Sequence, residues 1–188
     1  RRSKLLLVLG LGNPGQRFEH TRHNVGFDVV RRVADQKSLT IRKRLFRPYA
    51  WSGSGDFVLA IPLTYMNRSG HVIPGLLNAT GASVEDLLVV CDNLDLPAGT
   101  VRIKRRGSAR SHNGLASIMD ALGTGDFARL YLGIGRPRGE TTVIEHVLSV
   151  PGDDELELYG RAVDEAAQAV LDLQTQPLDA VMNAVNQR

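Results

Sequence analysis

Polar side chains with catalytic chemistry gather in the loops that follow apolar segments of this sequence. Asn13 and His23 both follow the first apolar segment, Asp92 follows a later one, and His112 lies in another loop. A neutral histidine can act as a general base, and a carboxylate can orient its ring and stabilise the imidazolium form. Asparagine amides donate to carbonyl oxygens and accept from peptide N–H groups. The other members of this polar set are Asn67, Asp95 and Asn113.

No serine or cysteine stands out as a nucleophile. Cys91, the single cysteine, lies within an apolar segment and is interpreted as a structural thiol. The polar set therefore indicates water attacking an ester or an amide. His20 and His23 have no third metal ligand at a recognisable spacing, so a metal site is not predicted. Each asparagine also has a structural interpretation, with Asn13 serving turn geometry and Asn67 capping a helix.

Alternating strands and helices must position these side chains. Leu5 to Leu9 form an unbroken apolar run, typical of a strand buried on both faces, and helical spacing begins after Asn24, a candidate N-cap. The alternation predicts one α/β domain over residues 1–188, a sandwich with a mostly parallel (mixed) twisted sheet flanked by helices. Carboxyl ends of parallel strands meet at one edge, where we expect the polar loops to lie together.

The remaining elements follow from periodicity and turn residues. A hairpin is expected around the turn at 53–56, and Pro74 falls early in a helix, where proline is tolerated. One strand alternates apolar residues with Arg102, Lys104 and Arg106, so one of its faces is cationic. Strands are expected at 49–52, 57–61, 87–91, 100–106 and 129–135, and helices at 72–77, 115–122, 154–174 and 180–185.

The loop after the first strand also matches a dinucleotide-binding fingerprint. Gly10, Gly12 and Gly15 have the G-x-G-x-x-G spacing, but that fingerprint needs a helix that starts directly in the loop. Residues 16–23 are polar and carry no helical stripe. Asp35, near the position expected for a ribose-binding acid, falls inside the later helix. The sequence therefore argues against a nicotinamide cofactor.

Composition is that of an ordinary globular protein with a slight excess of positive charge. The 188 residues are 43% hydrophobic and carry a net charge of +3, which mildly favours a polyanionic partner over the alternative of a basic surface without function. A single cysteine excludes internal disulfides and indicates a reducing compartment. No apolar run reaches the roughly 20 residues that span a bilayer, and Arg1 to Lys4 show no signal peptide. We therefore expect a cytoplasmic protein without membrane association.

Five motifs in order resemble those of the bacterial-type peptidyl-tRNA hydrolases. They are GLGNPG (10–15), TRHNVG (21–26), TYMNRSG (64–70), DNLDLPAG (92–99) and SHNGL (111–115), and LGIGRP (132–137) fits as well. The resemblance runs from about Leu5 to the C-terminus. It implies hydrolysis of the ester between a peptide and the 3′ end of tRNA, without metal or organic cofactor. It also implies a cytoplasmic monomer that binds the acceptor stem and needs no protein partner.

The resemblance assigns roles to residues at matching positions. It implies that His23 activates water, that Asp92 orients His23, and that Asn13 distinguishes an N-blocked chain from a free aminoacyl ester. Tyr65 matches an aromatic residue near the terminal adenosine. The substrate and tRNA contacts expected by resemblance or from the residues themselves are Phe18, Tyr65, Asn67, Asn113, Lys104, Arg106 and Arg129.

Several positions depart from the family pattern. Those away from the cationic strand are Phe18 in place of tyrosine, Asn93 in place of an acid, and Arg110 and Ser111 in place of Gly-Gly. In the family, a lysine matching Lys104 and an arginine at the position of Tyr131 hold the tRNA 5′ phosphate. Strand alternation places Arg129 on the face of Tyr131, so we expect Arg129 to supply the missing charge at a less favourable reach.

A binding module is the rival hypothesis. Some relatives of the family serve organellar intron splicing and bind a protein partner, which predicts an exposed apolar patch and slow or absent hydrolysis. The presence of Asn13, His23 and Asp92 argues for an enzyme instead. Release of tRNA from an N-acetyl-aminoacyl-tRNA, measured with a chelator present, discriminates between the two.

Overall fold

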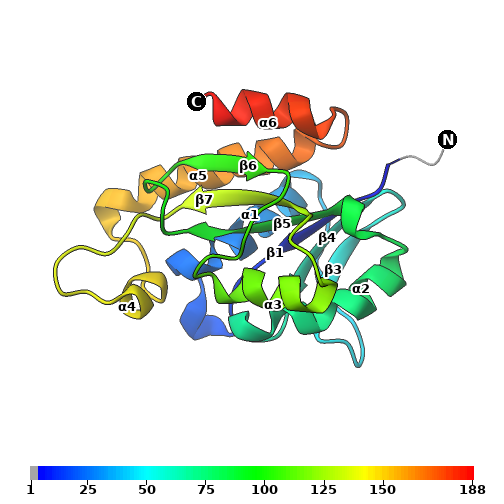
Figure 1. Cartoon of the computed structure of the whole chain (residues 1–188), viewed down its shortest axis with the longest axis horizontal. Coiled ribbons are helices and arrows are strands. Elements are labelled where there is room, and N and C mark those ends of the chain that lie inside the picture. The colour runs from blue at the N-terminus through cyan, green and yellow to red at the C-terminus, as the bar shows by residue number, and fades with distance from the viewer. Residues whose placement is uncertain (1–3) are drawn as a thin grey trace.

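The computed structural model describes residues 4–188 as one seven-stranded sheet with helices on both faces (Figure 1). The strand order is β2-β3-β4-β1-β5-β7-β6, with parallel pairing from β4 through β1 and β5 to β7 and antiparallel pairs at both ends. The strands are β1 (Leu6–Gly10), β2 (Arg42–Lys43), β3 (Tyr49–Ser54), β4 (Phe57–Pro62), β5 (Leu87–Asn93), β6 (Val101–Lys104) and β7 (Ala128–Gly133). The predicted α/β fold with a mixed sheet in a single domain is confirmed.

Six α-helices and four 3₁₀ segments complete the described chain, residues 4–188. The α-helices are α1 (Val25–Gln36), α2 (Ile73–Thr80), α3 (Asn113–Leu122), α4 (Val143–Val147), α5 (Asp153–Asp172) and α6 (Leu178–Asn186). The 3₁₀ segments are η1 (Gln16–Phe18), η2 (Arg22–Asn24), η3 (Met66–Val72) and η4 (Val84–Asp86). Neither α4 nor β2 was expected, because both are too short for periodicity to identify.

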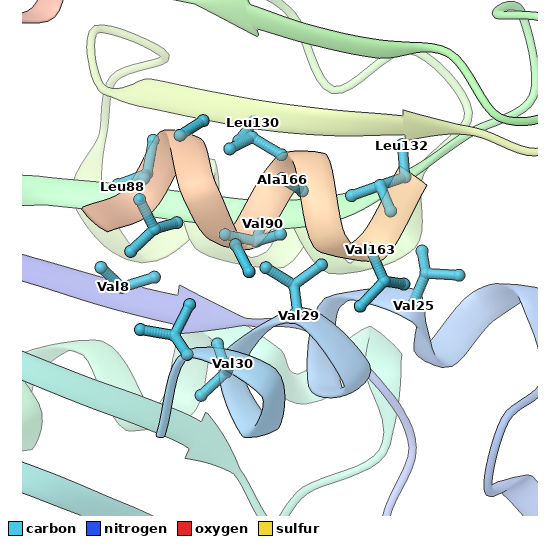
Figure 2. Close-up of a cluster of buried hydrophobic side chains, with 14 of the residues drawn as sticks. Val8, Val25, Val29, Val30, Leu88, Val90, Leu130, Leu132, Val163 and Ala166 are labelled. Carbon is cyan, nitrogen blue, oxygen red and sulfur yellow. The ribbon is translucent and has the colours of Figure 1, made fainter. Parts of the chain in front are cut away.

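Alternation along the central strands divides the core into two layers. Val8 of β1 faces α1 and α5, whereas Leu7 and Leu9 face the layer of α2, α3 and η3. In Figure 2 the labelled side chains of α1 and α5 lie against those of the central strands, among them Val90 and Leu130. Burial on both faces explains why the β1 and β5 sequences are unbroken apolar runs.

Close backbone packing explains Gly10, the first glycine of the dinucleotide-like spacing, and Gly26 in α1. A Cβ atom on Gly10 would lie 2.3 Å from the carbonyl oxygen of Gly26 and 2.6 Å from Cγ2 of Val30. A Cβ atom on Gly26 would lie 2.4 Å from the carbonyl oxygen of Val90. These glycines therefore let α1 approach the ends of β1 and β5. Two short 3₁₀ segments, η1 and η2, form between β1 and α1, and α1 itself begins at Val25.

Local expectations were met except for the two helix caps, Asn24 and Asn67, and Asn67 lies inside η3, whose N-cap is Tyr65. Pro74 lies in the first turn of α2, and β3 and β4 form the expected antiparallel hairpin. Asn24 does precede α1, but its side chain caps no helical N–H and bonds Asn13 instead. The sequence at Arg1 to Lys4 was expected to contain no signal peptide, and residues 1–3 of that stretch lie outside the described residues. Among the helices that the structure describes, none is long and apolar enough to cross a membrane.

Candidate active site

Two of the predicted catalytic residues, His23 and Asp92, meet at the carboxyl end of β5, whereas the third, Asn13, follows β1 and lines a separate cavity. Asp92 lies near the end of β5 and is 2% exposed, and His23 reaches it from η2, directly before α1. His112 reaches the same carboxylate from the other layer, where it caps the N-terminus of α3. We call His23, Asp92 and His112 the histidine–aspartate cluster. The strand-end location expected for the polar loops is thus what the fold produces.

Hydrogen bonds fix the ring orientation of both histidines. Nδ1 of His23 lies 2.9 and 3.0 Å from the two carboxylate oxygens of Asp92 and donates to them. Nδ1 of His112 accepts from the Leu115 N–H at 3.2 Å, which places the hydrogen of a neutral ring on Nε2, 2.9 Å from Oδ1 of Asp92. His23 is therefore left with an Nε2 lone pair that Asp92 does not use.

The electrostatics of the cluster keep Asp92 ionised and His23 basic. Burial alone would raise the pKa of Asp92, but His23 and His112 supply charge and hydrogen bonds that hold this pKa well below its usual range. Burial opposes the charged form of His23 as well. The charge of Asp92 and the hydrogen bond to it outweigh burial and raise the pKa of His23 above its ordinary value of 6.5. Such an arrangement strengthens a general base and stabilises its protonated form.

Asn13 is held by contacts on both its backbone and its side chain. Its backbone N–H and C=O each bond the side-chain amide of Asn24 at 2.9 Å. Its Oδ1 accepts from the Met66 N–H at 2.7 Å, which joins the GLGNPG loop to the start of η3. No described residue accepts a hydrogen bond from Nδ2 of Asn13, so this donor is the part of the amide left for a ligand.

A cavity of about 120 Å³ opens beside the cluster. His23, Asp92 and His112 line its polar part, and the side chains of α4 form part of its apolar part. Its other lining residues include Leu94, Asp95, Arg110, Asn113, Leu115 and Tyr131. The cavity thus places a base, a neutral apolar wall and a cation around one small volume.

Comparison with known proteins identifies the family. The family model described as peptidyl-tRNA hydrolase matches residues 7–188. The chain belongs to this family. The peptidyl-tRNA hydrolase of Shouchella clausii (strain KSM-K16) is 41% identical over 183 residues, covering 96% of this chain and 99% of that protein. The one from Bacillus subtilis (strain 168) is 40% identical over 185 residues, covering 97% and 98%.

Solved structures give the same result. The crystal structure of peptidyl-tRNA hydrolase from Acinetobacter baumannii superposes with a TM-score of 0.90 at 34% identity. The match covers 99% of this chain and 96% of that chain. The resemblance to the peptidyl-tRNA hydrolase family that the sequence motifs suggested is therefore confirmed over nearly the whole chain.

The predicted substrate contacts of this peptidyl-tRNA hydrolase family member include two aromatic residues and two amides, of which Asn113 lines the same cavity as the cluster. Phe18 and Tyr65 pack edge to face with ring centroids 6.3 Å apart, and Tyr65 is exposed. Asn67 and Asn113 are exposed and line a shared groove between η3 and α3, while Asn113 also lines the catalytic cavity. These positions agree with a substrate-binding role, which stays a prediction.

Arg129 does not occupy the position expected of a tRNA contact. Its side chain is 0% exposed and donates to the carbonyl oxygens of Ser108 at 3.1 Å and Gly125 at 2.7 Å. Strand alternation did place Arg129 on the face of Tyr131, but the loop that follows β6 covers that face. Arg129 therefore stabilises this loop from the protein interior, through its hydrogen bond to Ser108. Lys104 and Arg106, in contrast, are exposed as expected.

The histidine–aspartate cluster also has the composition of a metal site. Its donor atoms lie within 4.8 Å of one another. The nitrogens that face Asp92 are hydrogen-bond donors at 2.9–3.0 Å, so a metal would have to displace these hydrogens. The geometry fits a hydrogen-bonded array better than a set of free ligands. Metal-independent hydrolysis stays a prediction of the sequence.

Sequence reasoning missed three residues that position the cluster. His112 was in the polar set, but its spacing did not reveal a second bond to Asp92. Asn24 was interpreted as a helix cap. Arg22 is buried and anchors the segment of His23, because its guanidinium donates to Ser149 Oγ and to Glu155 Oε2, each at 2.6 Å. Bonds between segments so distant in the chain leave no signal in local spacing.

Proposed function

We propose that this chain hydrolyses peptidyl-tRNA with His23 as the base that activates water. The reaction itself follows from the family, whose members are hydrolases acting on the ester between a peptide and tRNA. Our proposal concerns how this chain performs it. The observation that carries it is the pairing of His23 Nδ1 with the buried carboxylate of Asp92, which leaves Nε2 to accept a proton.

The steps of hydrolysis follow from the tautomer of His23, whose Nε2 is free to accept a proton. Nε2 of His23 takes a proton from water while the water oxygen attacks the ester carbonyl carbon. Asp92 stabilises the imidazolium that forms, and His112 holds Asp92 from its other side. Collapse of the tetrahedral intermediate breaks the bond to the tRNA 3′ oxygen, which takes the proton from His23. The products are a peptide with a free carboxyl group and a tRNA with a free 3′ terminus.

Asn13 is proposed to recognise the blocked amino group. A peptide or N-acetyl group carries a carbonyl oxygen that a free amine lacks, and Nδ2 of Asn13 is the available donor for it. The bond from Met66 holds the amide in the orientation that presents this donor. Asn67 and Asn113 are proposed to bind the substrate further along the groove between η3 and α3.

The tRNA is proposed to bind through its acceptor stem and 3′ end. Lys104 and Arg106 offer exposed cations near the loop that leads to His112, and phosphate contacts of this kind position nucleic acids. Phe18 and Tyr65 supply aromatic surface for a nucleobase. We propose that the chain is cytoplasmic, because its substrate arises in translation. We also propose that it acts as a monomer without an obligate protein partner.

Hydrolysis of N-acetyl-aminoacyl-tRNA by the purified chain, with excess chelator, tests this proposal. We expect release of free tRNA that the chelator does not abolish. The rival binding module predicts an exposed apolar surface, and Leu45, Phe46 and Ile144 are indeed exposed. Ile144 lines the catalytic cavity, which accounts for it without a protein partner, whereas Leu45 and Phe46 do not line that cavity. Absence of hydrolysis by wild-type protein that retains tRNA binding would favour the rival.

A further inference from the structure

Arg110 has a backbone conformation that few residues other than glycine adopt. Its φ is +48°, in the left-handed region, and it lies in a tight turn closed by the bond from His112 N–H to the Ala109 carbonyl oxygen at 3.0 Å. A large side chain in such a conformation costs stability that glycine would not cost. The family commonly has Gly-Gly at positions 110 and 111, so the chain departs from it at this turn. Strain of this kind clusters at functional sites.

The guanidinium of Arg110 lies at the mouth of the catalytic cavity. Arg110 lines the same cavity as His23, Asp95 and Tyr131, and its side chain is 67% exposed. Burial raises the pKa of Tyr131, and the charges of Arg129 and, more weakly, Arg110 oppose that rise. Arg110 therefore adds a second positive charge near Tyr131, and unlike the buried Arg129 its side chain is exposed.

Asp95 holds Arg110 loosely. Asp95 Oδ1 accepts from Nη2 and Nε of Arg136 at 2.6 and 3.1 Å, whereas the contact between Asp95 Oδ2 and Nη1 of Arg110 is longer, 3.6 Å. One carboxylate thus faces two guanidinium groups, which leaves an excess of one positive charge. The shorter pair occupies Arg136, so Arg110 is the group free to bind an incoming anion.

We propose that Arg110 is an anion-binding residue of this chain that holds a phosphodiester of the single-stranded 3′ end of the substrate at the mouth of the catalytic cavity. This proposal rests on the proposed function and names a determinant of substrate binding in that site. A guanidinium binds phosphate oxygens in a bidentate fork. The turn that carries Arg110 leads directly to His112, so a phosphate bound there is held at a fixed offset from the histidine–aspartate cluster.

Arg110→Gly is the variant of choice, because glycine accepts the positive φ and removes the charge without new strain. Arg161→Gln is its matched control, since Arg161 is an exposed arginine on α5 that does not line the cavity. Arg110→Lys retains the charge but loses the fork. Melting temperatures are measured for all variants, and we expect that of Arg110→Gly to be at or above that of the wild type.

Binding is measured with a fluorescent single-stranded RNA oligonucleotide that ends in CCA, across a salt series. We expect Arg110→Gly to weaken binding roughly twofold to fivefold, the scale of an exposed charge contact, with Arg110→Lys in between. The slope of log K against log salt should fall by about 0.7, as for one phosphate contact on a single strand. The control should match the wild type. Unchanged affinity and slope in Arg110→Gly would overturn the proposal.

Hydrolysis is compared on two N-acetyl-aminoacyl esters, one of this oligonucleotide and one of adenosine, which has no phosphodiester. Arg110→Gly should lower the ratio of kcat/KM for the oligonucleotide ester to that for the adenosine ester by the same factor, roughly twofold to fivefold. An unchanged ratio would assign Arg110 a purely structural role in the turn. If the wild type hydrolysed neither ester, the proposed function would fail, and oligonucleotide binding would still decide the role of Arg110.

Discussion

The histidine–aspartate cluster and the exposed cations of β6 and of the loops after β6 and β7 are held in opposite ways. Asp92 is buried and bonds two histidines that come from different layers of the fold. Arg110, Arg136, Lys104 and Arg106 are exposed, and we call these four the cationic rim. Asp95, the carboxylate that pairs with Arg110 and Arg136, is exposed to solvent, whereas Asp92 of the cluster is buried. The cluster therefore depends on fixed geometry, and the rim depends on net charge.

This difference predicts how the two regions tolerate change. In a low-dielectric interior, removing one member of a hydrogen-bonded array leaves its partners unsatisfied, at a large cost. An exposed ion pair contributes roughly 0–1 kcal/mol and is screened by salt. Substitutions in the cluster should therefore abolish turnover, whereas those in the rim should alter affinity and its salt dependence. Of the departures from the family pattern, Arg110 belongs to the rim, and Tyr131 lines the same cavity as Arg110.

His23→Ala should have the largest effect. Loss of the general base should lower kcat roughly 10²–10⁴-fold, while tRNA binding persists because the rim is untouched. Turnover and filter binding, measured on the same preparation, check both parts. Near-full turnover in this variant would show that His23 is not the general base.

Asn13→Ala should have a smaller effect that depends on the substrate. Loss of the contact from Nδ2 to the blocked amino group costs about 1–3 kcal/mol on the blocked ester. The unblocked aminoacyl ester lacks that carbonyl group and should lose far less. The ratio of kcat/KM for the two esters measures the difference. Equal losses on both would show that Asn13 serves only the loop geometry built on Asn24 and Met66.

Arg129 tests whether a cation in the interior behaves like the cluster or like the rim. Arg129→Met should lower the free energy of unfolding by about 1–3 kcal/mol, because the carbonyl groups of Ser108 and Gly125 lose their donor. The salt slope of tRNA binding should stay that of the wild type. Urea unfolding and a salt series measure the two. A flattened slope with unchanged stability would restore Arg129 to the RNA surface.

The smallest effects are expected at the rim itself. Lys104→Ala should flatten the log–log salt dependence of tRNA binding by roughly one unit, as loss of one phosphate contact does. Tyr131→Arg should steepen it by a similar amount and tighten binding at low salt. Filter binding of tRNA with and without its 5′ phosphate provides the measurement. Tyr131 is largely buried, so an unchanged slope would mean that this position faces only the cavity.

Sequence reasoning recovered the parts of the molecule that depend on local pattern. Apolar runs identified β1 and β5, and convergence of their carboxyl ends correctly predicted that His23, which follows β1, and Asp92, near the end of β5, lie together. The short elements β2 and α4 escaped because periodicity needs more residues. Alternation placed Arg129 on the correct face, but alternation does not say which loop covers that face.

Contacts between segments distant in the chain could not be predicted from local sequence patterns, because such patterns do not specify tertiary packing. The bond of Arg22 to Glu155 and the second bond of Asp92, from His112, depend on tertiary packing. The positive φ of Arg110 is likewise set by the turn that the fold imposes before α3. Residue types suggested each of these chemistries, but only the coordinates assign the partners.

The pH dependence of kcat/KM in wild type and Asp92→Asn tests the central claim most directly. His23 must be neutral to accept a proton, so wild-type activity should fall as pH drops through a His23 pKa above 6.5. Asp92→Asn removes the charge that raises this pKa and leaves burial, which lowers it. We predict lower turnover and a midpoint shifted to lower pH. A midpoint that stays at the wild-type value would contradict the account, because Asp92 would then not control the base.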